Sequence, residues 1–254
     1  MKVKTVLIIC LLCFSILSGC QAQDNDQQQA TNQPQPTVCL FFDDAWANQY
    51  EEALPVLLDY DFTATFGVIT DFIGTGEDIW RYMSEEELND LVDHGMEIAS
   101  HTRTHPSLTD NLTDLQLLDE IINSKTDLEE AGFDVKGLIY PYYDWDERVL
   151  EYVKDAGYAY ARNGWAPEIP FQLPLPDNDS IYHLPAVSIY KEDMETFQSI
   201  VDAVGPDSAI CLVYHFVSDT GPESTSTPIA NFLAQMAYLK EAGFRVIAIS
   251  ELID

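Results

Sequence analysis

Two histidines, His101 and His105, lie four residues apart in the sequence, directly after a short apolar run. Neutral imidazoles at this spacing can bind one divalent metal ion. Two adjacent carboxylates, Asp43 and Asp44, end another apolar run, and a third imidazole, His215, ends a later one. One aspartate and two histidines form a three-ligand centre with an open coordination position, which is typical of catalytic zinc. The sequence therefore predicts a metal site with a second carboxylate and a third imidazole available for proton transfer.

This combination of groups favours the metal-assisted hydrolysis of an acyl derivative. A divalent metal can lower the pKa of a bound water toward about 7 and can polarise a carbonyl group. The second carboxylate would accept the proton of the water, and the third imidazole would protonate the leaving group. Positioned acids and bases of this kind typically contribute about 10²–10⁴-fold to the rate. The same three ligands also suit a non-haem iron centre, but the additional aspartate and histidine argue against that alternative.

The chain around these motifs alternates between short apolar runs and helical patterns, which predicts a parallel sheet with helical crossovers. Strands are expected at residues 38–42, 63–69, 96–99, 137–140, 158–161, 182–187, 209–214 and 244–250. Helices are expected at residues 51–60, 84–94, 113–131, 147–156, 192–204 and 229–242. We therefore expect an α/β fold, a distorted (β/α) barrel of seven or eight parallel strands in a single domain. In such barrels the chemistry lies beyond the carboxyl ends of the strands, where the carboxylates and imidazoles described above would meet.

Two of the helices begin with a clear sequence signal. Ser84 and Thr113 are each followed three residues later by Glu or Gln, which predicts a capping box at both positions. Four apolar residues are expected to share the buried face of the second of these helices, namely Leu115, Leu118, Ile121 and Ile122. Residues 166–179 contain four prolines and are expected to form a long loop.

The N-terminus has the features of an export signal. Residues 1–19 combine a basic start with a short apolar run, which predicts a signal peptide. Residues 17–20, Leu-Ser-Gly-Cys, resemble a bacterial lipobox, which implies cleavage before Cys20 and lipidation of that residue; an ordinary secretory cleavage site is the alternative. Residues 20–36 are rich in Gln, Asn, Asp and Pro and predict a disordered tether, followed by the barrel at residues 37–254. We therefore expect an exported protein, anchored to the membrane as a lipoprotein of the cell envelope.

The charge balance restricts the partners of the chain. It has 43 acidic and 12 basic residues and a formal net charge of −31. Such a protein should not bind nucleic acid through neutralisation of phosphates. The charge is typical of a solvated, self-repelling surface, or of an acidic groove for a cationic polymer.

Two cysteines, Cys39 and Cys211, remain once the N-terminal cysteines are assigned to the signal and its anchor. Each lies four residues before a residue of the predicted site, Asp43 or His215. Equal offsets of even parity would point both thiols into the barrel at the same layer. We expect two buried free thiols, with a disulfide as the alternative in an oxidising compartment.

The motifs resemble those of the polysaccharide deacetylase family, the family-four carbohydrate esterases, over about residues 37–250. Residues 42–44, Phe-Asp-Asp, resemble the first motif, which implies Asp43 as the general base and Asp44 as a metal ligand. Residues 101–106 match the second motif, His-Ser/Thr-x-x-His-Pro, at every defined position. That likeness implies His101 and His105 as the other metal ligands.

Two further motifs lie later in the chain. Residues 140–142, Tyr-Pro-Tyr, resemble the third motif of a tyrosine-proline-tyrosine subgroup. This likeness implies that Tyr142 contacts the substrate and that its backbone N–H helps to hold the oxyanion; losing one such donor typically costs about 2.7–4 kcal/mol. Residues 213–215 resemble the last motif, apolar-x-His, and imply His215 as the general acid.

The chain also departs from the family pattern. The arginine that usually precedes the third-motif proline, where it orients the catalytic aspartate, is missing. Arg162 could supply that cation from another direction, or could form an ordinary surface salt bridge. The fourth motif, an Asp with a Trp, is not clear. Trp165 is expected to wall the acetyl pocket and bind substrate, and Trp46 or Trp145 could stack on a sugar face; simple packing is the alternative for each.

The resemblance implies a metal-dependent hydrolase that removes acetyl groups, with N-acetyl groups expected, from an extracellular or cell-wall polysaccharide. The expected cofactor is Zn²⁺, with Co²⁺ or Ni²⁺ as alternatives. The expected partners are an acetylated polysaccharide and, through the lipid on Cys20, a membrane. Two alternatives stay open. One is a catalytically degenerate glycan-binding lipoprotein, which the missing arginine and the unclear fourth motif favour. The other is a hydrolase of a different amide or ester on the same barrel.

Overall fold

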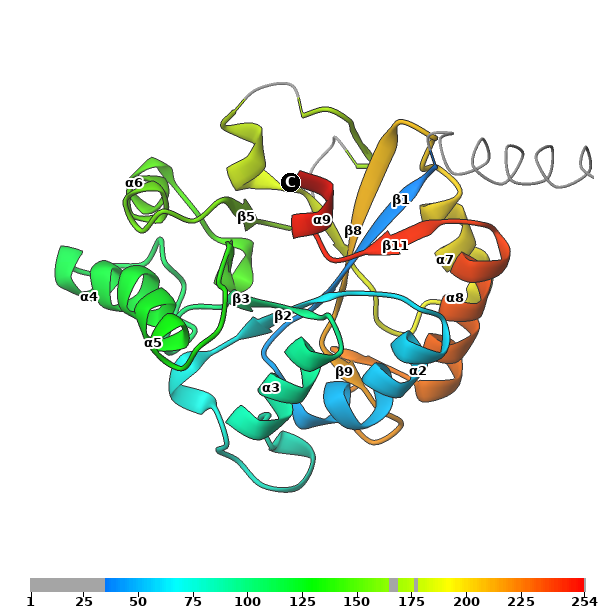
Figure 1. The fold of residues 1–254 in the computed structure, drawn as a ribbon, viewed down its shortest axis with the longest axis horizontal. Coiled ribbons are helices and arrows are strands. Elements are labelled where there is room, and N and C mark those ends of the chain that lie inside the picture. Colours follow the sequence, from blue (N-terminus) through cyan, green and yellow to red (C-terminus); the bar gives the residue numbers. More distant parts are fainter. Residues whose placement is uncertain (1–34, 165–168, 176–177, 254) are drawn as a thin grey trace, which may run out of the picture. The chain divides into compact units, whose positions relative to one another are not determined.

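The computed structural model describes residues 35–164, 169–175 and 178–253. Seven parallel strands form its central sheet: β1 (Thr37–Phe42), β2 (Thr65–Val68), β3 (Glu97–Ser100), β4 (Gly137–Ile139), β5 (Tyr160–Arg162), β7 (Ala186–Ser188) and β8 (Ser208–Tyr214). Their order in the sheet is β5-β4-β3-β2-β1-β8-β7. β1 and β8 run side by side through the middle of the fold (Figure 1) and pair over the full length of β1.

The outer strands of this order, β5 and β7, approach each other through a short parallel pairing. Arg162 at the end of β5 is bridged to Leu184, just before β7. The N–H of Asn163 donates to the carbonyl of Leu184 at 3.0 Å. The sheet therefore curls into a nearly closed barrel, which confirms the predicted (β/α) barrel and its single domain.

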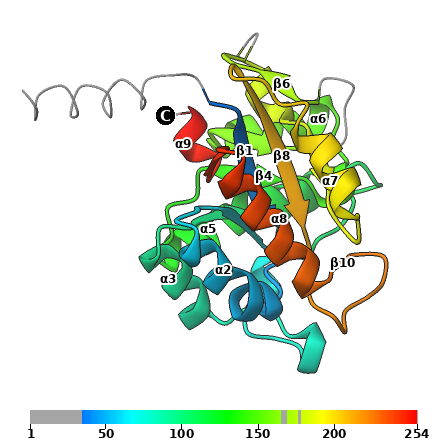
Figure 2. The same cartoon turned by 90° about the vertical axis from the view of Figure 1, so that its right-hand side faces the viewer.

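Helices cover the outside of this sheet (Figures 1 and 2). The α-helices are α2 (Leu54–Asp59), α3 (Glu85–Asp93), α4 (Asp114–Leu118), α5 (Ser124–Glu130), α6 (Glu147–Asp155), α7 (Met194–Val201), α8 (Ile229–Glu241) and α9 (Ser250–Ile253). Two π-helical turns, η1 (Gln49–Ala53) and η4 (Asp119–Asn123), precede α2 and α5. The predicted capping boxes at Ser84 and Thr113 are confirmed, since each hydroxyl accepts the N–H three residues on and each backbone N–H is bound in return.

Side chains along β1 alternate between the two sides of the sheet, as the two-residue period of a strand requires. Leu40 and Phe42 belong to the large apolar cluster between sheet and helices. Cys39 and Phe41 belong to a smaller cluster inside the barrel. Cys39 pairs in register with Cys211 of β8, and both cysteines are buried and free, as expected.

The helical segment from α4 to α5 buries a different face from the predicted one. Leu115 is 78% exposed and Leu118 is 37% exposed, whereas Leu117, Ile121 and Leu128 are buried. The predicted face was therefore wrong for two of its four residues. The sequence holds two overlapping apolar stripes along this helix, and only packing against the sheet selects between them.

Three predicted segments differ in detail. The loop predicted at residues 166–179 contains β6 (Phe171–Gln172), which adds antiparallel to the start of β8. The strand predicted at 182–187 is a 3₁₀ turn, η6 (Ser180–His183), followed by β7. The last predicted strand is shorter: β11 (Arg245–Ile247) pairs with β1 and then ends. The next two N–H groups, of Ala248 and Ile249, donate to the side-chain hydroxyls of Thr63 and Thr65 and not to the backbone carbonyls of a neighbouring strand.

The predicted signal peptide, Cys20 and all but the last residues of the predicted tether lie outside the described residues. Across the described ranges, none of the helices has the length and apolar character needed to cross a membrane.

Candidate active site

The carboxyl ends of β1, β3 and β8 meet at one rim of the barrel. Asp43 directly follows β1, His101 follows β3, and His215 follows β8. The buried side-chain amide of Gln49 ties two of these ends together, since it donates to the backbone carbonyls of Asp43 at 2.6 Å and His215 at 2.7 Å. Sequence reasoning missed this role, because a single glutamine just before a predicted helix has no feature that separates it from a solvated one.

The backbone of this rim is strained at several positions. Left-handed φ values occur outside glycine at Asp44 (75°), Ala45 (57°), Thr102 (64°), His105 (61°), Tyr142 (54°) and Tyr143 (65°). This conformation costs a side-chain-bearing residue about 1–2 kcal/mol. Residues held in such conformations cluster at functional sites, where surrounding contacts over-determine them. The strain therefore marks the rim as the part of the fold that is organised around a ligand.

Three side chains of the rim converge on one point. Asp44 Oδ1 lies 3.5 Å from His101 Nε2 and 3.6 Å from His105 Nε2, and the two Nε2 atoms are 3.2 Å apart. With metal–ligand bonds of about 2.0–2.1 Å, the ligand atoms of a tetrahedral site are roughly 3.3–3.4 Å apart. The observed triangle therefore fits a single divalent ion bound by one oxygen and two nitrogens.

His101 is prepared to coordinate through Nε2. Its Nδ1 lies 2.8 Å from the carbonyl oxygen of Ile139, which can only accept, so Nδ1 carries the hydrogen and Nε2 keeps its lone pair. Burial lowers the pKa of His101 to about 4, outweighing the attraction of the nearby aspartates, and the ring is neutral as a ligand must be. Gly67 of β2 leaves room for this arrangement, because a Cβ there would lie 2.6 Å from Ile139 Cδ1.

Asp43 and Arg162 form a buried ion pair behind the metal triangle. Arg162 Nη2 donates to both carboxylate oxygens, at 2.8 and 2.6 Å, and neither residue is more than 2% exposed. Burial would raise the pKa of Asp43, but the guanidinium, with His101 and His215, holds that pKa below its ordinary value. The structure thus brings Arg162 onto the aspartate that the missing arginine would orient, and Asp43 is an ionised carboxylate of fixed direction.

The guanidinium of Arg162 is itself enclosed by aromatic rings. It lies 5.3 Å from the ring centre of Phe41 and 5.4 Å from that of Tyr143. The Tyr143 hydroxyl is hydrogen-bonded to Ser188 of β7. Gly164 allows this packing, because a Cβ there would lie 2.4 Å from Tyr143 Cγ.

His215 lies near the same carboxylate. Its Nε2 lies 3.9 Å from Asp43 Oδ2, and its ring lies 6.0 Å from that of Tyr190. Its Nδ1 is buried and finds no hydrogen-bond partner within the described residues. His215 is therefore close enough to share a reacting group with Asp43, but its ring is held less firmly than that of His101.

These groups line one cavity of about 300 Å³. Six of the predicted site residues line the cavity: Asp43, Asp44, His101, His105, Tyr142 and His215. Four further residues line it with them: Tyr140, Tyr143, Tyr190 and Thr225. Tyr142 is 63% exposed, and its ring packs edge-on against His105 at 4.7 Å. No motif marks Tyr190 or Thr225, because loops from distant parts of the chain bring them here.

The remaining predicted residues lie elsewhere. Trp165 and Cys20 are outside the described residues. Trp46 is only 8% exposed and packs in an aromatic cluster. Trp145 stacks on His183 with ring centres 3.8 Å apart. Neither Trp46 nor Trp145 lines the cavity, and both pack on other rings rather than facing it.

Comparison with known proteins relates this site to a family. The sequence profile described as polysaccharide deacetylase matches residues 30–161, just over half of the chain. YxkH of Bacillus subtilis, which is named for the same family, is 31% identical over 122 residues. That alignment covers 48% of this chain and 42% of YxkH, so the chain spans less than half the length of this relative.

Solved structures share the fold at lower identity. A family 4 carbohydrate esterase from Bacillus anthracis is 18% identical, with a TM-score of 0.57 and 94% of each chain covered. A family 4 pseudoenzyme from Bacillus anthracis is 21% identical, with a TM-score of 0.55, and the match covers 87% of this chain and 66% of that one. These two likenesses concern the fold alone. With the profile match over half its length and the barrel that carries the motifs, the chain belongs to the polysaccharide deacetylase family.

Proposed function

We propose that this protein is a metal-dependent hydrolase that removes acetyl groups, in particular N-acetyl groups, from an extracellular or cell-wall polysaccharide. One observation carries the proposal: a single cavity holds a ligand triangle for a divalent ion beside an ionised carboxylate and a third imidazole. Hydrolysis of an acyl bond needs these parts together, namely a Lewis acid, a base for water and an acid for the leaving group. Membership of the polysaccharide deacetylase family supports the same reaction class.

Asp44, His101 and His105 would hold the divalent ion. We expect Zn²⁺, with Co²⁺ or Ni²⁺ as alternatives that suit the same nitrogen and oxygen donors. When bound, the ion would supply Lewis-acid polarisation of the acyl oxygen and of the attacking water.

The side chains around that ion would carry out the proton transfers. Asp43 would accept a proton from water while the water oxygen bonds to the acetyl carbon, and Arg162 would keep this carboxylate ionised and oriented beforehand. The backbone N–H of Tyr142 would donate to the oxyanion. His215 would protonate the sugar nitrogen or oxygen as its bond to the acetyl carbon breaks. The products would be acetate and a free amine or hydroxyl on the polymer.

The sequence supports finer parts of this proposal. The Tyr-Pro-Tyr segment at 140–142 supports the tyrosine-proline-tyrosine subgroup, and Trp165 would wall the acetyl pocket. The lipobox-like residues 17–20 support an exported lipoprotein of the cell envelope, with a signal at 1–19, a tether at 20–36 and the barrel at 37–254. A tethered enzyme of this kind would act on polymers near its membrane.

Acetate release by the purified, zinc-loaded protein tests the proposal. Acetylated glycans of several classes, including peptidoglycan, chitin oligosaccharides and acetylated xylan, serve as substrates. A chelator should abolish release, and Asp43→Asn should reduce it by about 10²–10⁴-fold while zinc content stays the same. Absence of acetate from every glycan, with zinc bound, would contradict the proposal.

The buried Nδ1 of His215 favours one alternative, a glycan-binding protein without turnover. A general acid whose ring is loosely held would protonate poorly. This alternative predicts glycan affinity that survives both His101→Ala and Asp43→Asn, with no acetate from the native chain. Release of acetate from small N-acyl compounds but not from polymers would instead support a hydrolase of a different amide or ester.

A further inference from the structure

The Asp44 carboxylate is held on the side opposite the two histidines. Its Oδ1 faces the Nε2 atoms of His101 and His105, while its Oδ2 accepts a hydrogen bond of 2.9 Å from the indole N–H of Trp46. Trp46 is 8% exposed, so this bond lies largely out of bulk water, where a bond to a charged acceptor is strong. Because an indole N–H can only donate, Trp46 can bind the carboxylate but cannot occupy a ligand position itself.

Aromatic stacking fixes the direction of this indole. The Trp46 ring lies between Tyr82, at a centroid distance of 4.1 Å, and Phe216, at 4.6 Å, with interplanar angles of 25° and 27°. Trp80 packs edge-on against it at 5.8 Å. A ring clamped on both faces can rotate little about its own bonds. Its N–H is therefore directed at Asp44 and not at alternative acceptors.

The segments that carry these rings are joined through their backbones. The N–H of Ala47 donates to the carbonyl of Arg81, and the N–H of Met83 donates to that of Ala45, both at 2.8 Å. Trp46 and Tyr82 form an antiparallel bridge between the same segments. The loop between β2 and α3 is thus attached to the turn that contains the proposed metal ligand.

The turn alone does not fix the Asp44 side chain. Asp44 and Ala45 both have left-handed φ values, and the Asp44 side chain is 14% exposed, so it borders the open part of the cavity. An unsupported carboxylate in such a turn can rotate and present either oxygen. We infer that Trp46 is a positioning residue, whose N–H holds Oδ2 so that Oδ1 completes the metal triangle. This inference rests on the metal site of the proposed function.

The N–H of Trp46 and the volume of its ring would affect metal binding differently. Partners that hydrogen-bond a metal ligand typically change metal affinity by 10–100-fold. If Trp46 acted only as packing, an aromatic ring without the N–H would bind metal equally well. Trp46→Phe keeps a flat ring between Tyr82 and Phe216 and removes the donor. Trp46→Tyr is a second variant, with a side chain larger than that of phenylalanine. Its hydroxyl lies at the tip of the ring and not at the position of the indole nitrogen.

Trp80→Phe is the matched control. Trp80 belongs to the same aromatic cluster and undergoes the same chemical change, but it is 51% exposed and packs on Trp46 rather than on Asp44. Zinc affinity of the purified full chain would be measured by calorimetry with a competing chelator, and folding by thermal unfolding of the metal-free protein. We expect 10–100-fold weaker zinc binding in Trp46→Phe and Trp46→Tyr, and a change within about twofold in Trp80→Phe.

The outcomes distinguish this inference from the proposed function. Native affinity in a folded Trp46→Phe or Trp46→Tyr variant would overturn it, as would an equal loss in Trp80→Phe. A native chain that binds no zinc would overturn both the inference and the metal-dependent function. Zinc binding that depends on Trp46 in a chain that releases no acetate would support the inference and contradict the deacetylase.

Discussion

Two carboxylates, the buried Asp43 at one end of the barrel and the partly buried Glu97 at the other, have pKa values shifted in opposite directions. Burial opposes ionisation of Asp43 at the rim, but Arg162 overcomes this effect and its pKa lies below the ordinary value. Glu97 begins β3 at the other end, and there burial prevails and raises the pKa. Glu97 accepts hydrogen bonds from the hydroxyls of Tyr160 and Thr65. This difference shows that hydrogen bonds from neutral donors can leave the pKa of a carboxylate raised, whereas a guanidinium in contact lowers that pKa and keeps the carboxylate charged.

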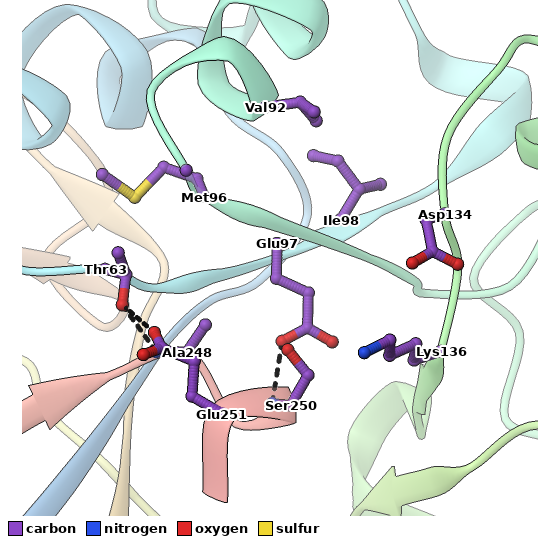
Figure 3. Close-up of a pocket in the computed structure, with 11 residues that line it drawn as sticks. Thr63, Val92, Met96, Glu97, Ile98, Asp134, Lys136, Ala248, Ser250 and Glu251 are labelled. Carbon is purple, nitrogen blue, oxygen red and sulfur yellow. Dashed lines mark hydrogen bonds between the residues drawn. The ribbon is translucent and has the colours of Figure 1, made fainter. Parts of the chain in front are cut away.

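The surroundings of Glu97 explain what this end of the barrel does. Figure 3 shows its side chain extending from β3 toward Ser250, the first residue of α9, in a cavity of about 410 Å³. The Ser250 N–H donates to Glu97 at 3.2 Å, and Thr63 donates to Glu251 of the same helix. These bonds join β2, β3, β5 and α9. The base is thus a structural junction, whereas the rim carries the ion pair and six of the left-handed non-glycine residues.

The largest difference between the two ends is expected in activity. His101→Ala removes one corner of the proposed metal triangle, so zinc retention and acetate release should be lost together while the barrel stays folded. Tyr160→Phe, which removes one donor to Glu97 at the base, should keep both within about twofold. Zinc content, acetate release and circular dichroism measure these effects. Full activity of His101→Ala would show that His101 is not a metal ligand.

Arg162→Met should give the largest loss of stability. It leaves Asp43 as an uncompensated buried charge, which typically costs about 3–5 kcal/mol of unfolding free energy. The native Asp43 pKa is lowered, so the pair stabilises the fold above the unfolded pKa, and this contribution disappears as the pH falls through the folded pKa. Urea unfolding of the metal-free protein should therefore show a deficit at pH 7 that shrinks in acid. A deficit that does not change with pH would mean that lost packing, and not the charge of Asp43, sets the cost.

The sequence predicted the parts of the molecule that depend on local pattern. Apolar runs that end in Asp43, His101 and His215 indicated strands and a shared rim, because parallel strands of one barrel present their carboxyl ends on the same side. The helix starts at Ser84 and Thr113 were equally readable, since a capping box lies within four consecutive residues.

The parts that were not predicted depend on contacts between distant segments. Gln49 joins the ends of β1 and β8, and Trp46 holds Asp44 only because Tyr82 and Phe216 clamp its ring. The prediction of which face of α4 is buried was wrong for a related reason. Leu115 fits a helical stripe as well as Leu117 does, and only the position of the sheet decides which of them is buried.

Glu97→Gln should change stability in the opposite direction to Arg162→Met. The native Glu97 pKa is raised, so stability is fully present below the unfolded pKa and declines as the pH rises toward the folded pKa. An isosteric amide can keep bonds to Ser250, Thr65 and Tyr160 without carrying the charge. Unfolding free energy at pH 8 should therefore be higher than in the native chain and should match it near pH 4. A variant less stable than the native chain at pH 8 would show that the charge of Glu97 is stabilised after all.

The smallest effect concerns the strain at the rim. Ala45 has a φ of 57°, which glycine adopts without steric cost, so Ala45→Gly should relieve strain that exceeds the added entropy of the unfolded chain. The expected gain is below about 1 kcal/mol. Ala47→Gly is the matched control, since Ala47 is as buried as Ala45, at 3% exposure, but is not among the residues with left-handed φ, so the same change should only lower stability there. Thermal unfolding of the two variants should thus move in opposite directions. If both variants lose stability equally, the left-handed turn after Asp44 stores no strain at Ala45.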